Sequence, residues 1–127
     1  MENEFIKNLA DPEVIERIWQ KAIVVEGYDP SLYRKDFAEA WIARDSYADC
    51  NSPFGWEIDH VYPESLGGDN HFINLRPMNW RNNRSKGDSY PQYNAVVTSD
   101  ETRNIDKDVN CTVNTKLQNL LKTLYQS

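Results

Sequence analysis

The segment between Trp56 and Gly87 constrains the fold most, because the sequence pattern changes three times within it. In WEIDHV, apolar residues alternate with Glu57 and Asp59, which predicts a strand that ends near His60. The loop YPESLGGDNH follows, INLRP predicts a second short strand, and MNWRNNRSK predicts a short helix that ends at Gly87. The segment therefore predicts a hairpin of two strands followed by a helix.

The length of the chain, 127 residues, is that of one domain, so we expect a single domain over residues 1–127. Within it, residues 55–88 form the motif core, and residues 1–54 and 89–127 support it. No apolar run approaches the ~20 residues of a membrane span, and the first residues lack the pattern of a secretory signal. We therefore expect a cytoplasmic protein without membrane association; contact-dependent delivery stays open.

Helical patterns flank the core on both sides. Asp11-Pro12 is typical of a helix start, and apolar residues recur at helical spacing after it, so a helix is expected to end before Gly27. Leucines near the end of the chain predict a closing amphipathic helix with Asn114 or Thr115 as its N-cap. The remaining predictions are short strands at residues 40–44 and 93–98 and a charged surface loop at residues 98–110.

Charge is unevenly distributed. The formal net charge of −6 argues against a protein that simply coats nucleic acid. The stretch RPMNWRNNRSKGD nevertheless carries four basic residues against one acid. A local basic patch in an acidic protein indicates a site. On charge alone, a solvated helix face that carries arginines is the favoured interpretation.

The string DHVYPESLGGDNHFINLRPMNWRNNRSKGD resembles the HNH endonuclease motif in the form D-H-x-x-P-x-S-x-G-G, then N-L, then N-x-x-K-G. The spacings agree without a gap, and residues 19–45 resemble the leader that precedes the motif in small bacterial HNH-like proteins. The resemblance implies an α+β fold: a ββα-metal core, hairpin plus helix, flanked by an N-terminal and a C-terminal helix. It also implies divalent-metal hydrolysis of a phosphodiester bond.

The resemblance also assigns residue roles. His60 is the expected general base, Asp59 and Asn83 the ligands of Mg²⁺, Mn²⁺ or another divalent cation, and Asn74 the residue that bonds across the loop and holds His60. The chemistry suits these residue types, since imidazole accepts protons at cellular pH and hard cations prefer oxygen ligands. Asn82 could be the ligand instead of Asn83; spacing favours Asn83.

The basic residues are assigned to nucleic-acid phosphates. They are Arg76, Arg81, Arg84 and Lys86. Gly67 and Gly68 let the loop turn tightly beneath the site.

The sequence departs from the family in its zinc site. Many HNH proteins brace the hairpin with two CxxC pairs; here the second pair falls at Asn79 and Asn82, and no CxxC precedes the motif. We expect no structural zinc and assign its role to apolar packing. The residues expected to pack are Trp56, Leu66, Phe72, Leu75 and Met78.

Other residues receive plainer interpretations. His71 is expected to be a solvent-exposed loop residue, and Asp69 a turn or cap residue. Cys50 and Cys111 are expected to be free thiols. Trp19, Trp41 and Trp56 are expected in the core, and Trp80 is ambiguous between core and surface.

Three functions stay open. An active nuclease is favoured because the motif is complete, with DNA preferred over RNA as substrate. A non-catalytic nucleic-acid or protein binding module usually lacks the base or a ligand, and neither is missing here. The third is a bacterial antagonistic nuclease effector held in check by an immunity partner. Sequence specificity, nicking against double-strand cleavage, and oligomeric state are undetermined by the sequence.

Overall fold

The computed structural model describes residues 4–126 of the chain. Among these residues the helices are α1 (Pro12–Trp19), α2 (Trp80–Lys86) and α3 (Thr115–Tyr125). The strands are β1 (Tyr33–Lys35), β2 (Trp41–Ala43), β3 (Trp56–His60), β4 (Leu75–Asn79), β5 (Gln92–Asp100) and β6 (Arg103–Thr112). They pair as three antiparallel hairpins, β1 with β2, β3 with β4 and β5 with β6. This mixture of helices and small antiparallel sheets agrees with the expected α+β class.

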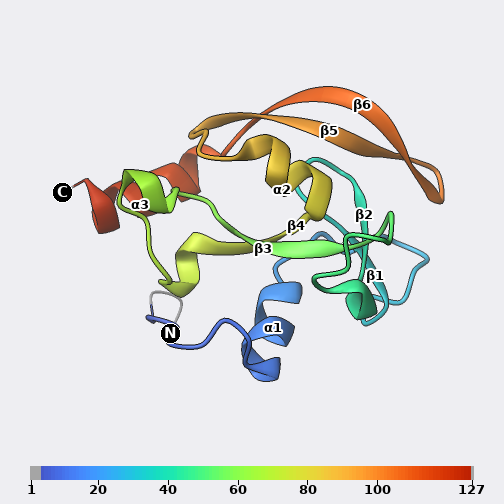
Figure 1. Cartoon of the computed structure of the whole chain (residues 1–127), viewed down its shortest axis with the longest axis horizontal. Coiled ribbons are helices and arrows are strands. Elements are labelled where there is room, and N and C mark those ends of the chain that lie inside the picture. Colours follow the sequence, from blue (N-terminus) through green and yellow to red (C-terminus); the bar gives the residue numbers. More distant parts are fainter. Residues whose placement is uncertain (1–3, 127) are drawn as a thin grey trace.

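The β3–β4 hairpin lies in the middle of the molecule (Figure 1). α2 packs between this hairpin and the long β5–β6 ribbon, whereas α1 lies on the other side of the hairpin and α3 at one end. Two apolar clusters fill the spaces between these layers. One contains Trp19 and Trp56, whose ring centroids are 5.4 Å apart, and the other contains Met78 and Leu121. Burial of each such side chain contributes about 1.5–3 kcal/mol, so the hairpin is fixed from both sides.

The N-terminal helix starts as expected and ends early. The side chain of Asp11 accepts a hydrogen bond from the backbone N–H of Glu13, and Pro12 is the first helical residue. α1 ends at Trp19, well before Gly27, because the chain leaves the helix to pair with β1. The backbone N–H of Ile23 donates to the carbonyl of Lys35 at 2.8 Å. The strand β1 itself lies in a segment that the sequence indicated as turns.

Residues 98–110 do not form the expected surface loop. They belong to β5 and β6, which pair from Gln92–Thr112 to Asp100–Arg103. The charged sequence is misleading because most of β6 is exposed, so few of its positions need apolar side chains. The strand expected at 93–98 is present within β5.

The remaining expectations agree well with the structure. Asn114 is the N-cap of α3, and its side chain accepts from the backbone N–H of Leu117 at 2.8 Å. Trp19, Trp41 and Trp56 are buried, and both cysteines are free thiols. Within residues 4–126, no helix combines the length and the apolar character that crossing a membrane requires.

Candidate functional site

The end of β3 brings the motif residues together. β3 pairs with β4 so that Asp59 lies opposite Arg76 and His60 opposite Leu75. Asp59 is 4% exposed, whereas the side chain of His60, where the strand ends, is 17% exposed. α2 follows β4 directly and carries Asn83 back towards β3. As a result Asp59, His60 and Asn83 line one cavity of about 240 Å³.

Asp59 is held by two cations. Arg76 donates from Nε to its Oδ2 at 3.2 Å, and the Nζ of Lys86 lies 3.2 Å from its Oδ1. Lys86 also donates to the backbone carbonyl of His60 at 3.1 Å. Burial lowers the pKa of Lys86, and the charge of Asp59 opposes that shift. Because burying a carboxylate is costly unless it is paired, these two cations compensate the burial of Asp59 and hold its side chain in place.

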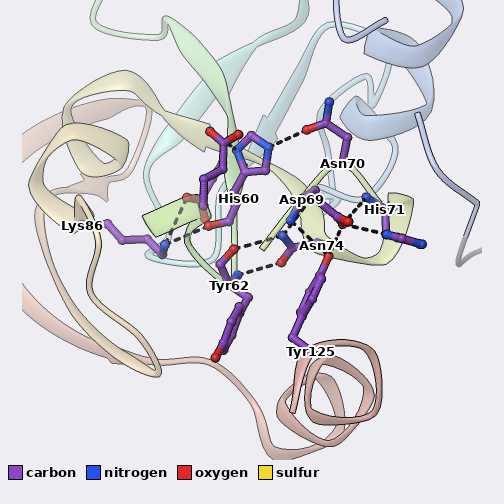
Figure 2. A network of polar contacts seen from close by, with 10 residues as sticks. His60, Tyr62, Asp69, Asn70, His71, Asn74, Lys86 and Tyr125 are labelled. Carbon is purple, nitrogen blue, oxygen red and sulfur yellow. Dashed lines mark hydrogen bonds and ion pairs between the residues drawn. The ribbon is translucent and has the colours of Figure 1, made fainter. Parts of the chain in front are cut away.

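His60 is oriented by a residue that sequence reasoning missed. Its Nε2 lies 2.7 Å from the Oδ1 of Asn70 (Figure 2). An amide oxygen only accepts hydrogen bonds, so in the neutral imidazole Nε2 carries the proton and Nδ1 is the free acceptor. Nδ1 lies 3.8 Å from an oxygen of Glu64. The basic nitrogen of His60 is therefore the one on the Glu64 side.

Asn74 does bond across the loop, but it does not contact His60. The side chain of Asn74 is fully buried. It accepts from the N–H of Tyr62 at 2.7 Å and donates to the carbonyls of Tyr62 and Asp69, each at 3.0 Å. The residue that hydrogen-bonds to the ring of His60 is Asn70 (Figure 2). Asn74 thus closes the loop between the two strands.

Asp69 is the centre of a second network. Its Oδ1 accepts from the hydroxyl of Tyr125 at 2.6 Å and lies 2.7 Å from the Nδ1 of His71 (Figure 2). The desolvation of Asp69 is outweighed by these hydrogen bonds, so the pKa of Asp69 is lowered. Burial and the bond to Asp69 raise the pKa of Tyr125. The expectation of a solvent-exposed His71 is wrong, because this network and the ring of Phe5 partly bury it.

The glycines shape the loop in different ways. Gly67 has a φ of 108°, a conformation that favours glycine. At Gly68 a Cβ atom would lie 1.8 Å from the carbonyl oxygen of Tyr62, so only glycine fits there. The tight turn expected from the sequence is present.

The four basic residues divide into two pairs. Arg81 and Arg84 are at the surface, where they form ion pairs with Asp106 and Glu57 at 2.6 and 3.2 Å. Arg76 and Lys86 are buried against Asp59. Arg81 and Arg84 are therefore accessible to a phosphate at the surface. Arg76 and Lys86 affect the site only through their contacts with Asp59.

Asn83 and Asn82 face different surroundings. Asn83 lines the cavity and donates from Nδ2 to Glu57 at 3.1 Å. Asn82 is fully buried, with Nδ2 donating to Asp36 and Val97 and Oδ1 accepting from the N–H of Val97. Its amide is therefore occupied away from the cavity. Of the two residues that the sequence left open as ligands, only Asn83 lies at the site.

A buried polar cluster lies at Asn79 and Asn82, the positions that the sequence comparison with the HNH motif assigned to its second cysteine pair. The carboxylate of Asp36 accepts from the backbone N–H of Asn79 at 3.0 Å and from the side chain of Asn82 at 3.1 Å. Two further N–H groups, of Ala38 and Ala40, bond to its other oxygen. The expectation that packing alone braces the hairpin is therefore incomplete. Trp56, Leu75 and Met78 are buried, and Phe72 packs against the cluster that contains Trp56 and Leu75. Leu66 is 52% exposed and does not contribute.

The cavity contains oxygen donors that suit a hard cation. Asp59, Glu64, Asn83 and Asp88 all line it. Such a cation keeps several waters and needs few protein ligands, so a carboxylate and an amide are a sufficient protein share. Across residues 4–126, no group of three or more His, Cys, Asp or Glu side chains could hold a metal. The oxygen donors of the cavity are therefore of the type that a hard divalent cation prefers, and both oxygens of Asp59 are paired with Arg76 and Lys86 in the structure.

Comparison with known proteins supports the resemblance. Residues 50–92 match the family model described as HNH endonuclease, and the matched segment contains β3, β4 and α2. The expected resemblance to the HNH endonuclease family is thereby confirmed for this segment, and the match indicates a nuclease or nucleic-acid-related function. No curated protein and no solved structure matches the chain significantly.

Proposed function

On the premise that residues 50–92 form an HNH endonuclease segment, we propose that the protein is a divalent-metal-dependent endonuclease. It hydrolyses phosphodiester bonds of nucleic acid, with DNA preferred over RNA, and β3, β4 and α2 are its ββα-metal core. The observation that carries this proposal is the single cavity shared by Asp59, His60 and Asn83.

His60 is the general base of the proposed reaction. Its free Nδ1 accepts the proton of the attacking water, while Asn70 keeps the proton on Nε2 and holds the ring. Glu64, whose carboxylate lies 3.8 Å from this nitrogen, lines the same cavity as Asp59 and Asn83. Asn74 supports the arrangement from a distance, because it fixes the loop that carries Asn70.

Asp59 and the amide oxygen of Asn83 would hold the cation. When bound, the metal ion polarises the scissile phosphate and stabilises the leaving oxygen. The guanidinium groups of Arg84 and Arg81 lie at the surface of α2 and are suited to phosphate oxygens of the flanking chain. Lys86 and Arg76 hold the carboxylate of Asp59 in place.

The proposal is tested by cleavage of supercoiled plasmid DNA with Mg²⁺ or Mn²⁺. We expect nicked or linear product from the wild type, none after chelation, and a loss of about 10²–10⁴-fold in rate for His60→Ala. Lys107→Ala is the control, because Lys107 is exposed on β6 and does not line the cavity. If wild type and His60→Ala are both folded and equally inert across metals and substrates, a non-catalytic binding module replaces the enzyme.

A further inference from the structure

We propose that the groove between α3 and the Tyr90–Pro91 turn is a substrate subsite that binds the nucleotide next to the scissile phosphate. This inference rests on the proposed nuclease function. The groove has a volume of about 420 Å³, which is within the range of pockets for small ligands.

The groove adjoins the catalytic cavity on two sides. Pro63 and Glu64 line the catalytic cavity, whereas Tyr62 and Leu66, in the same turn, line the groove. In the same way Gly87 and Asp88 line the cavity, and Tyr90 and Pro91 line the groove. The two hollows thus share these two short chain segments. In the proposed complex, the nucleotide next to the phosphate at His60 follows these segments into the groove.

The charge of the groove suits a phosphodiester. Residues 109–127 contain two lysines and no acidic residue, although the chain as a whole has a net charge of −6. One of the two, Lys122, is exposed on α3 and lines the groove. Its ammonium has no hydrogen bond or ion pair within the part of the chain that the structure describes. A cation without a protein partner is free to bind a phosphate oxygen.

The other walls suit a base. The half-buried ring of Tyr90 packs edge-on against Tyr62, with centroids 4.9 Å apart. Tyr62 in turn stacks on Tyr125 at 5.1 Å, so the aromatic wall is rigid. Base–aromatic stacking tolerates every base, because each base has a π-face. Asn119, whose side chain makes no hydrogen bond among residues 4–126, adds an amide that can bond to a base edge.

Two substrates separate the subsite from the catalytic centre. One is a short single-stranded oligonucleotide, and the other is bis(p-nitrophenyl) phosphate, a phosphodiester without nucleotides. For Lys122→Met we expect the ratio of kcat/KM for the oligonucleotide to that for bis(p-nitrophenyl) phosphate to fall about tenfold, the scale of one lost charge-assisted contact. The control Lys107→Met removes an exposed lysine of β6 that does not line the groove, and the ratio is expected to keep its wild-type value.

Binding is measured separately by fluorescence anisotropy of the labelled oligonucleotide. Lys122→Met is expected to weaken binding and to reduce the slope of log K against log salt by about 1. If Lys122→Met binds as tightly as Lys107→Met, with the same salt slope, the subsite is overturned while plasmid cleavage still supports the nuclease. If the wild type cleaves no substrate, the nuclease proposal fails, and anisotropy alone decides whether the groove binds nucleic acid.

Discussion

The hydroxyl of Tyr125 donates a 2.6 Å hydrogen bond to the carboxylate of Asp69, and this bond ties the last turn of α3 to the loop of the candidate site. Asp69 directly precedes Asn70, whose amide oxygen contacts His60 at 2.7 Å. The C-terminal helix therefore reaches the proposed base through two hydrogen bonds and one peptide link. We infer that Tyr125 is a positioning residue for His60.

Tyr125→Phe tests this inference. The variant keeps the aromatic ring that stacks on Tyr62 and loses only the hydroxyl. We expect kcat to fall about three- to tenfold with KM nearly unchanged. The free energy of unfolding is expected to fall by about 1–2 kcal/mol, because the hydroxyl loses its bond to the Asp69 carboxylate and the longer bond, 3.3 Å, that it accepts from the backbone N–H of Asp69. Tyr28→Phe is the control, since the hydroxyl of Tyr28 makes no hydrogen bond among residues 4–126.

The stability loss of Tyr125→Phe depends on pH. The pKa of Asp69 is lowered in the folded protein, since hydrogen bonds from Tyr125 and His71 outweigh desolvation. An acid with a lowered pKa stabilises the fold above its ordinary pKa, near 3.8, and loses this contribution as pH falls through the lowered value. The difference between wild type and variant in urea unfolding is therefore expected to be full at neutral pH and to shrink below about pH 4. A kcat equal to that of the wild type would show that Tyr125 is only structural.

How much of the structure could be predicted from the sequence depends on how far apart in the chain the interacting residues are. β3, the loop and α2 were predictable because alternation, turn glycines and helix ends act over a few residues. Asp69 and Tyr125 are 56 residues apart, so no local pattern connects them. The Asp69-x-His71 spacing, typical of a local turn bond, was the one available signal for this network. The role of Asp36 behind the hairpin could not be predicted either, because two of its four partners, Asn79 and Asn82, are 43 and 46 residues away in the chain.

Lys86 and Arg84 were assigned the same role from the sequence, and the structure predicts that they behave differently. Lys86→Met removes one of the two buried cations that pair with Asp59 and leaves Arg76 as the other. We therefore expect the free energy of unfolding to fall by about 2–4 kcal/mol. The slope of log K against log salt for DNA binding is expected to stay unchanged. Arg84→Met removes an exposed charge, so we expect that slope to fall by about 1 with little change in stability. Denaturant unfolding and salt-dependent anisotropy measure both quantities. A reduced salt slope for Lys86→Met would show that this lysine contacts phosphate.

Asp36→Asn tests the buried cluster behind the hairpin. The carboxylate accepts four N–H groups, and an asparagine would turn its own amide towards two of them. We expect a loss of roughly 2–5 kcal/mol in the free energy of unfolding.

Burial raises the pKa of Asp36, so the folded protein holds this proton more tightly than the unfolded chain. The contribution of Asp36 to stability therefore falls as pH rises from the ordinary value of 3.8 through the raised value, and the gap between wild type and variant narrows in that window. Unfolding series from about pH 4 to pH 7 measure the gap; a gap that widens with pH would contradict this account.

The two loop glycines are adjacent, and alanine at each is expected to act differently. In Gly68→Ala the new Cβ would lie 1.8 Å from the carbonyl oxygen of Tyr62, the same oxygen that accepts from Asn74 at 3.0 Å. The backbone must move, so the Asn74 bridge opens and stability falls by about 3 kcal/mol. In Gly67→Ala the Cβ meets nothing within 4 Å, and the cost is only the strained φ of 108°, about 1–2 kcal/mol. Because the bridge holds the loop that carries Asn70, we expect Gly68→Ala to lower the cleavage rate more than Gly67→Ala at a temperature where both are folded. Equal cleavage rates in the two variants would mean that the position of His60 does not depend on the bridge.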